Sequence, residues 1–241
     1  MLTVVGIGPG SEAMMTEQAI AAIRDADIIV GYKTYTHLVK PLIKDKEVIK
    51  TGMCKEIERC LVAIELAEQG KKVAMVCSGD AGIYGMAGLI LEIVTRQQRQ
   101  VEVRVVAGIT ASIAASALLG APLMHDFCHI SLSDLLTPWE VIEKRIQAAA
   151  QADFVVCFYN PRSRGRDEHL ARAFALMAPW TSPQTPVGVV KAANRKKEEK
   201  WLTTFEEMDF ERVDMTSLVI VGNKTTYISN GLMITPRGYV L

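Results

Sequence analysis

The sequence has no excess of charge of either sign. Its 27 lysine and arginine residues are balanced by 27 aspartate and glutamate residues. A neutral chain produces no long-range field that would attract nucleic acid or an anionic membrane. We therefore expect neither of these partners, and an anionic ligand would have to be bound by local clusters of basic side chains.

Long apolar runs and paired cysteines are also absent. The sequence contains no run of about 18 uncharged apolar residues, which argues against a membrane-spanning helix. The first residues enter an apolar stretch at once, without the basic and apolar regions of a signal peptide. The five cysteines are scattered and form no C-x-x-C pair, so we expect no disulfide framework and no protein-bound metal. Together these absences predict a cytoplasmic protein.

Apolar runs alternate with segments of helical periodicity along the whole chain. Strands are predicted in the first half at 3–8, 27–31, 47–50, 72–77 and 101–106, and in the second half at 129–132, 154–159, 187–191, 218–221 and 231–234. Gly120-Ala121-Pro122 interrupts the alternation, which then resumes. The pattern predicts an α/β protein of two consecutive αβα domains with about five strands each, residues 1–119 and 120–241.

Several helices carry recognisable signals. Thr16 is a candidate N-cap, and a helix from about Lys55 to Gly70 places Ile57, Leu61 and Ile64 on one face. Thr137-Pro138-Trp139-Glu140 has the form of a capping box with proline in the first helical position.

A glycine-rich turn follows the predicted strand at 72–77. Its sequence is Ser78-Gly79-Asp80-Ala81-Gly82-Ile83-Tyr84-Gly85. Ligands of parallel α/β sheets bind at the carboxyl ends of strands, and glycine lets a ligand approach the backbone closely. Tight packing of a helix on the sheet explains the same glycines equally well. Asp80 could accept a hydrogen bond from a ligand or cap the helix that follows.

A second glycine-rich turn, Gly6-Ile7-Gly8-Pro9-Gly10, resembles a nucleotide loop but fails both standard tests. No G-x-G-x-x-G pattern is present, and Val30-Gly31-Tyr32 ends the second strand where an acidic residue would bind ribose. Ser11-Glu12 stands in place of the G-K-[ST] of a phosphate loop. These departures argue against a nicotinamide oxidoreductase, one alternative function for this chain.

The sequence resembles the tetrapyrrole (uroporphyrinogen/precorrin) methylase family over essentially the whole chain. The resemblance rests on the two glycine-rich turns, in this order, and on the segment Gly108-Ile109-Thr110-Ala111-Ser112. Within that family the resemblance is greatest to the precorrin-3B/cobalt-factor III C17-methyltransferases. It rests on three further segments, 130–139, 157–166 and 190–195.

The resemblance implies an enzyme that binds S-adenosylmethionine in a cleft between two α/β domains and releases S-adenosylhomocysteine. The implied cofactor contacts are Pro9, Ser78, Gly79, Asp80, Ile83, Thr110, Ala111, Asn160 and Ala193. The implied reaction is methylation of C17 of cobalt-factor III or precorrin-3B, with contraction of the ring to (cobalt-)precorrin-4. A homodimer and a tetrapyrrole substrate, with or without cobalt, are also implied.

Such a substrate carries many carboxylates, which arginine and lysine bind well. The candidate substrate-binding residues are Arg162, Arg164, Arg166, Lys191 and Arg195. Ring contraction requires proton transfer, and a histidine beside a carboxylate suits that task. We therefore identify His125 and Asp126 as the candidate catalytic pair, with a solvated linker pair as the alternative. His129 could equally be a hydrogen-bonded histidine within the sheet.

One departure from the family concerns Tyr32. Relatives that methylate uroporphyrinogen III carry an acid/base aspartate after the second strand, where this chain has Tyr32. The sequence is also compatible with a superfamily member that acts on a different precorrin, or with a non-catalytic protein of the same fold. An rRNA methylase or a diphthine synthase fits poorly with the neutral charge and with the segment 159–166.

Overall fold

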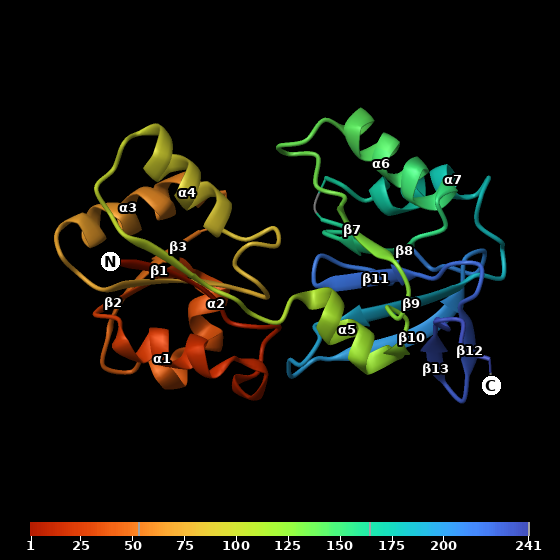
Figure 1. Ribbon diagram of the computed structural model, residues 1–241, viewed down its shortest axis with the longest axis horizontal. Coiled ribbons are helices and arrows are strands. Elements are labelled where there is room, and N and C mark those ends of the chain that lie inside the picture. The colour runs from red at the N-terminus through yellow and green to blue at the C-terminus, as the bar shows by residue number, and fades with distance from the viewer. Residues whose placement is uncertain (53, 164, 241) are drawn as a thin grey trace. The chain divides into compact units, whose positions relative to one another are not determined.

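The computed structural model describes residues 1–52, 54–163 and 165–240. The chain divides into two compact units, Met1–Ala111 and Ser112–Leu241, and both contain helices packed on a five-stranded sheet (Figure 1). The boundary predicted at residue 119 lies at the end of helix α5 (Ala111–Leu119), and the structural division lies at its start. Within the described residues, every helix is too short or too polar to cross a lipid bilayer.

The sheet of the first unit is entirely parallel and has the order β3-β2-β4-β1-β5. The strands are β1 (Leu2–Gly6), β2 (Ile28–Tyr32), β3 (Glu47–Thr51), β4 (Val73–Cys77) and β5 (Val103–Val106). Every residue of the central strands β1 and β4 is buried. This explains why these strands are continuous apolar runs in the sequence, as is usual when helices cover both faces of a parallel sheet. All five strands predicted for this half are present.

Four α-helices cover the two faces of this sheet, two on each face (Figure 1). They are α1 (Glu17–Asp25), α2 (Lys33–Leu38), α3 (Glu56–Glu68) and α4 (Ala87–Arg96), with short 3-10 helices at Glu12–Met14 and Lys40–Leu42. Thr16 caps α1 as predicted, because its Oγ1 accepts a hydrogen bond of 3.1 Å from the amide of Ala19. The helix predicted from Lys55 is confirmed as α3, but Ile57 does not share its buried face and is 62% exposed.

The sheet of the second unit has the order β10-β9-β11-β8-β7. Its strands are β7 (Phe127–Ser131), β8 (Val155–Tyr159), β9 (Pro186–Lys191), β10 (Glu199–Thr204) and β11 (Ser217–Val221). β7 and β8 are parallel, whereas β11 is antiparallel to both β8 and β9. β10 is an edge strand that begins in a charged run and was not predicted; charges are common on edge strands, where they hinder pairing with other chains.

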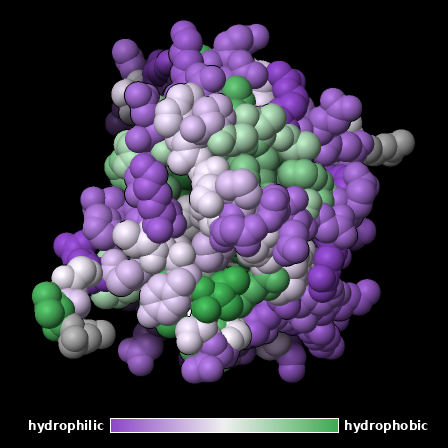
Figure 2. All heavy atoms as spheres, turned by 90° about the vertical axis from the view of Figure 1, so that its right-hand side faces the viewer, coloured by the Kyte–Doolittle hydropathy of each residue, from purple (hydrophilic) through white to green (hydrophobic). Residues whose placement is uncertain are grey.

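The strand predicted at 231–234 lies in a separate small sheet. This sheet has the order β12-β13-β6 and consists of Tyr227–Ser229, Leu232–Ile234 and Gly120–Ala121. It exposes Tyr227 and Leu232, and the surface of this unit in Figure 2 is mostly hydrophilic with separate hydrophobic areas. Scattered exposed apolar side chains of this kind are normal on protein surfaces.

The main sheet of the second unit is also covered on both faces. Helices α6 (Trp139–Gln151) and α7 (His169–Met177) pack on one face, where Phe158 and Phe174 belong to the core. On the other face α5 approaches β9 so closely that a Cβ on Gly188 would lie 2.6 Å from the side chain of Leu119. This contact explains why α5 belongs with the second unit.

The predicted capping box at Thr137 is wrong. Helix α6 begins at Trp139, and Pro138 occupies the N-cap position with no side-chain capping hydrogen bond. Pro138 has an extended ψ of 141° and therefore lies outside the helix. The start of the helix is shifted by one residue, so Thr137 and Glu140 no longer occupy the positions at which a capping box forms.

Candidate functional site

Three loops meet at the carboxyl edge of the first sheet. They follow the adjacent strands β1, β4 and β5 and contain residues 7–11, 78–86 and 107–110. Gly8 and Gly79 join the first two loops, because the amide of each donates to the carbonyl oxygen of the other, at 3.0 and 2.8 Å. The predicted glycine-rich turns are therefore parts of one structure.

The glycines allow these loops to pack backbone against backbone. A Cβ on Gly6 would lie 2.7 Å from the nitrogen of Gly108 and 2.9 Å from the carbonyl oxygen of Gly79. Gly79 itself has a φ of +67°, in the left-handed region that favours glycine. Close packing explains Gly6 and Gly108, and the left-handed backbone explains Gly79.

Asp80 holds two of the loops together. Its Oδ1 accepts hydrogen bonds from the amides of Gly82 (2.8 Å) and Ile83 (3.2 Å), and its Oδ2 accepts one from the amide of Gly108 (2.9 Å). Helix α4 begins only at Ala87 and has no side-chain cap, so the helix-cap interpretation of Asp80 is wrong. The carboxylate instead organises the loop at 78–86 and ties it to the loop after β5.

The other cofactor contacts expected in the first unit lie on the same three loops. Pro9 and Thr110 are buried, whereas Ser78 and Ile83 are half-buried. Ala111 is the first residue of α5. The first unit therefore brings the predicted contacts from β1, β4 and β5 to one edge of its sheet, the edge at which open α/β sheets bind ligands.

In the second unit, Asn160 and Ala193 also lie at one edge of a sheet. They follow β8 and β9, which run in the same direction because both are antiparallel to β11. Asn160 has a φ of +51° and donates a hydrogen bond of 2.9 Å to Ser131 Oγ. Ala193 lies between Ala192 and Asn194, which have φ values of +50° and +56°. Left-handed backbone at residues other than glycine is uncommon and is concentrated at functional sites.

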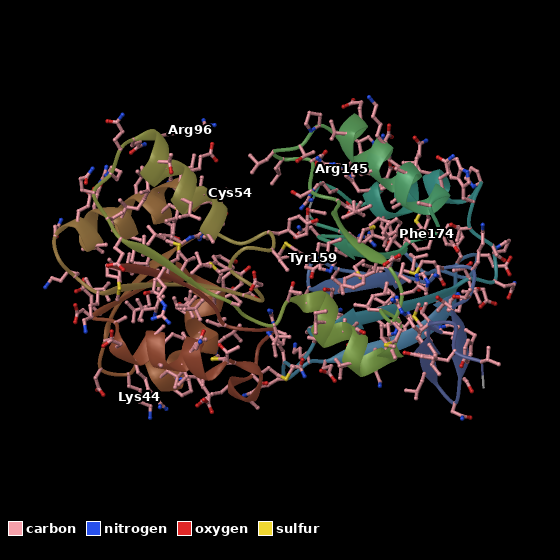
Figure 3. All side chains as sticks on the ribbon, viewed as in Figure 1. Lys44, Cys54, Arg96, Arg145, Tyr159 and Phe174 are labelled. Carbon is pink, nitrogen blue, oxygen red and sulfur yellow. The ribbon has the colours of Figure 1, made fainter. Side chains whose placement is uncertain are left out.

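A hydrogen-bonded cluster of Ser112, His129 and Tyr159 lies near this edge. The hydroxyl of Tyr159, labelled in Figure 3, accepts a hydrogen bond of 3.0 Å from the amide of Ser112 in the first turn of α5. Ser112 Oγ lies 2.8 Å from His129 Nε2, and burial lowers the pKa of His129. His129 is therefore a hydrogen-bonded histidine of the sheet. Its pairing with Ser112 was not predicted, because the two residues are separated in the sequence and meet only through the fold.

His125 and Asp126 lie at the opposite end of β7. β7 and β8 are parallel with Ser131 opposite Tyr159, so residues before Phe127 are about 17 Å from the edge that carries Asn160. The side chains of His125 and Asp126 are 43% and 76% exposed, and His125 Nδ1 lies 3.8 Å from Asp126 Oδ2. The structure does not bring this pair to the edge where Asn160 and Ala193 lie. The predicted catalytic role is untested, and the exposure of the pair favours the alternative of a solvated linker pair.

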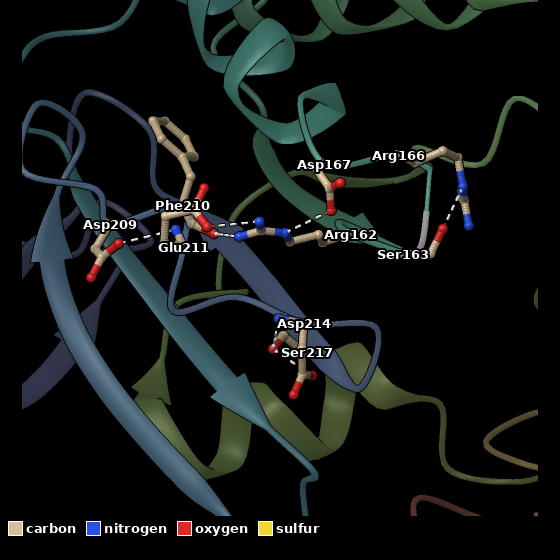
Figure 4. Close-up of polar contacts among 9 residues, drawn as sticks. All are labelled: Arg162, Ser163, Arg166, Asp167, Asp209, Phe210, Glu211, Asp214 and Ser217. Carbon is tan, nitrogen blue, oxygen red and sulfur yellow. Dashed lines mark hydrogen bonds and ion pairs between the residues drawn. The ribbon is translucent and has the colours of Figure 1, made fainter.

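Most of the predicted substrate-binding cations already contact protein groups. Arg162 binds Asp167 (3.1 Å), Glu211 (2.7 Å) and the carbonyl oxygen of Phe210 (3.0 Å), as Figure 4 shows. Arg166 Nε donates to Ser163 Oγ at 2.7 Å.

Lys191 and Arg195 also contact other groups of the protein. Lys191 lies 2.8 Å from a carboxylate oxygen of Asp214, and this hydrogen bond raises the pKa of Lys191. Arg195 is half-buried in the turn after β9, where its amide donates to the carbonyl oxygen of Ala192. Arg164 lies outside the described residues. The substrate-binding role of these five residues stays a prediction.

A lysine-lined cavity of about 810 Å³ in the first unit was not predicted from the sequence. Its basic lining residues are Lys33, His37, Lys40, Lys44, Lys46 and Lys50. Lys46 Nζ donates to the carbonyl oxygens of Arg24 and Ala26. In the described part of the chain, no carboxylate lies within ion-pair distance of Lys33, Lys40, Lys44 or Lys50. The cavity therefore combines space with unneutralised positive charge, which suits a ligand that bears several carboxylates.

Comparison with known proteins gives one consistent result. Residues 1–209 match the family model for tetrapyrrole (corrin/porphyrin) methylases. A probable cobalt-factor III C(17)-methyltransferase of Salmonella typhimurium is 74% identical over the whole length of both chains. A precorrin-3B C(17)-methyltransferase of a Sinorhizobium species is 39% identical over 99% of this chain and 96% of its own. The crystal structure of the methyltransferase CobJ superposes with a TM-score of 0.93, at 35% identity over 98% of this chain and 99% of that one.

Proposed function

This chain belongs to the tetrapyrrole (corrin/porphyrin) methylases, and we propose from this premise that it is a C17-methyltransferase of cobalamin biosynthesis. It transfers the methyl group of S-adenosylmethionine to C17 of cobalt-factor III or precorrin-3B, with contraction of the ring. The observation that carries this proposal is the 74% identity with the probable cobalt-factor III C(17)-methyltransferase of Salmonella typhimurium over the whole of both chains. The lysine-lined cavity supports it, because the substrate is a polycarboxylate.

Tetrapyrrole methylases use S-adenosylmethionine, and the three loops at the edge of the first sheet fit such a ligand. The half-buried Ser78 and Ile83 are within reach of a bound molecule, and the amides and carbonyls of the Gly79 loop lie at the same edge. An adenosyl sulfonium needs apolar walls together with a few fixed hydrogen-bonding groups. When bound, the cofactor supplies an electrophilic methyl group.

The residues of this chain have to position and desolvate the reactants. We expect Pro9, Ser78, Gly79, Asp80, Ile83 and Thr110 to contact the cofactor. The carboxylate of Asp80 also holds the loops in place. Ala111, Asn160 and Ala193 are the remaining proposed contacts. Attack by an electron-rich ring carbon on a sulfonium methyl group gains most from orientation and exclusion of water, so the methyl step requires no dedicated base.

The lysine-lined cavity is the part of the first unit that we expect to receive carboxylates of the substrate. Lys33, Lys40, Lys44 and Lys50 provide cations that no described carboxylate neutralises. In the second unit, Arg162 and Lys191 are already paired with acidic side chains, so they contribute less positive charge to an incoming anion. The first unit is therefore the stronger candidate for recognition of the substrate carboxylates.

We also propose that the protein is a homodimer in the cytoplasm. The proposal of a homodimer follows from the family resemblance. The five free cysteines, of which Cys60, Cys77 and Cys157 are buried, are consistent with a reducing compartment. Light scattering of the purified protein would distinguish a dimer from a monomer.

The decisive experiment incubates the purified protein with S-adenosylmethionine and either cobalt-factor III or precorrin-3B. We expect the preferred substrate to gain one methyl group by mass spectrometry, and parallel reactions without S-adenosylmethionine to give no product. Comparison of the two rates would show whether the substrate contains cobalt. If neither compound gains a methyl group, the proposal is wrong, and a different precorrin becomes the candidate substrate.

A further inference from the structure

Arg59 is a buried cation with unused hydrogen-bond donors. It lies in the first turns of α3 and is only 4% exposed. Among the described residues, no acceptor lies within hydrogen-bond distance of its Nε or Nη1. Its Nη2 is 3.6 Å from Glu56 Oε1, and the Glu56 side chain is 44% exposed. A buried guanidinium with so few partners is unfavourable unless another anion completes its contacts.

Arg59 is one of the residues that line a cavity of about 200 Å³ at the carboxyl end of β4. The other polar residues that line this cavity are Tyr32, Tyr35, Glu56, Ser78 and Tyr84. Ser78 belongs to the loop expected to contact the cofactor, and Tyr32 also lines the lysine-lined cavity. The Arg59 cavity thus adjoins the expected positions of both reactants within the first unit.

We propose that Arg59 binds a carboxylate group of a reactant in this cavity. The inference rests on the proposed function, because both S-adenosylmethionine and the tetrapyrrole carry carboxylates. A guanidinium binds carboxylates well, and phenol and serine hydroxyls can donate further hydrogen bonds. Glu56 already offsets part of the charge of Arg59. The cavity therefore suits a carboxylate with a single negative charge better than a phosphate dianion.

Arg99 shows how a structural arginine is arranged in the same unit. Its Nε and Nη2 both donate to the carboxylate of Glu68, at 2.9 and 2.6 Å. Arg59 makes no comparable pair of contacts with the residues that the structure describes. Removal of Arg99 should therefore destabilise the fold without affecting ligands, whereas removal of Arg59 should affect a ligand more than the fold.

The test compares Arg59→Met and Arg59→Lys with Arg99→Met as the matched control. Calorimetry measures the Kd of S-adenosylhomocysteine, an absorbance titration measures the Kd of the tetrapyrrole, and thermal unfolding measures Tm. In Arg59→Met we expect one of the two Kd values to rise about 10- to 100-fold, the loss typical of hydrogen bonds to a charged group. Arg59→Lys should restore part of the affinity, and the Tm of Arg59→Met should not fall.

The ligand whose Kd rises identifies the source of the carboxylate. If both Kd values stay within about twofold of wild type, the inference is wrong. A lower Tm with unchanged affinities would also overturn it and give Arg59 a structural role. If Arg59→Met does not fold, Arg59→Lys replaces it in the test: a raised Kd for one ligand supports the inference, and two unchanged Kd values contradict it.

Failure of the inference can be distinguished from failure of the proposed function. Methyl transfer by the wild-type protein decides the proposed function, whatever the Arg59 variants do. The calorimetric titration requires no turnover, so it decides the cofactor source even if neither tetrapyrrole is a substrate.

Discussion

Replacement of Asp80 by alanine removes the acceptor of three backbone hydrogen bonds. The amides of Gly82, Ile83 and Gly108 would lose their partner. Gly82 is exposed and can bind water, but Ile83 and Gly108 are half-buried. A hydrogen bond to a charged group contributes about 1.5–3 kcal/mol. Since water replaces part of these contacts, we expect a loss of about 2–4 kcal/mol in the free energy of unfolding.

Thermal unfolding followed by circular dichroism measures this loss as a fall in Tm of about 5–15 °C. The affinity for S-adenosylhomocysteine should fall in parallel, because the loops that carry Ser78 and Thr110 lose their connection. Asp80→Asn is the matched variant. It retains one acceptor oxygen, so it should lose fewer of the three hydrogen bonds and have an intermediate Tm.

Asp25→Ala is the control for an exposed carboxylate. Asp25 pairs with Lys72 at 3.0 Å, and both side chains are more than half exposed, so its removal should cost at most about 1 kcal/mol. If the stability of Asp80→Ala lies within that same range, the carboxylate does not hold the loops together. The role of Asp80 in joining the two loops would then be refuted.

Three further predictions concern other parts of the molecule. His125→Ala and Asp126→Asn should leave kcat within about twofold of wild type, because the pair is exposed and distant from Asn160; a catalytic acid or base would cost about 10²–10⁴-fold. Combined replacement of Lys33 and Lys44 by glutamine should raise the KM for the tetrapyrrole about 3- to 10-fold at low salt and less at high salt, with kcat unchanged. Burial lowers the pKa of His129, so below about pH 6.5 the folded protein binds fewer protons than the unfolded chain. The free energy of unfolding should therefore fall as the pH decreases below about 6.5.

Controls for these predictions come from residues of the same kind. A kcat more than about tenfold lower in His125→Ala would give the exposed pair a catalytic role after all. Lys72→Gln, on a lysine that already pairs with Asp25, should not change KM. His129→Gln should flatten the pH dependence of urea unfolding. An unchanged pH profile in His129→Gln would contradict the assignment.

The strands were the most predictable part of the fold, for a physical reason. β1, β4 and β8 are largely buried, so nearly every position had to be apolar. β10 was missed because it is an edge strand whose first residues are charged and exposed. The short helix α2 was missed because six residues are too few to show a helical period.

The candidate site was predictable only where the backbone requires glycine, because those glycines are visible in the sequence. The loops after β1, β4 and β5 pack so closely that positions 6 and 108 require glycine, and the φ of +67° at position 79 favours glycine there. The sequence displays these glycines directly. Contacts between distant residues leave no such pattern. The hydrogen bonds of Asp80 to Gly108 and of Ser112 to Tyr159 depend on the fold and could not be anticipated from spacing.

Helix α3 illustrates where reasoning from periodicity fails and why the failure is informative. An amphipathic helix would bury Ile57 and expose Arg59, but Ile57 is 62% exposed and Arg59 only 4%. Burial of arginine instead of isoleucine is unfavourable for folding alone. The buried guanidinium loses its hydration, and the exposed isoleucine forgoes the stabilisation that its burial would give. Departures of this kind from the expected pattern occur mainly at functional sites. The burial of Arg59 in the first turns of α3 is therefore a second observation in favour of the ligand proposed there, beside the cavity that Arg59 lines.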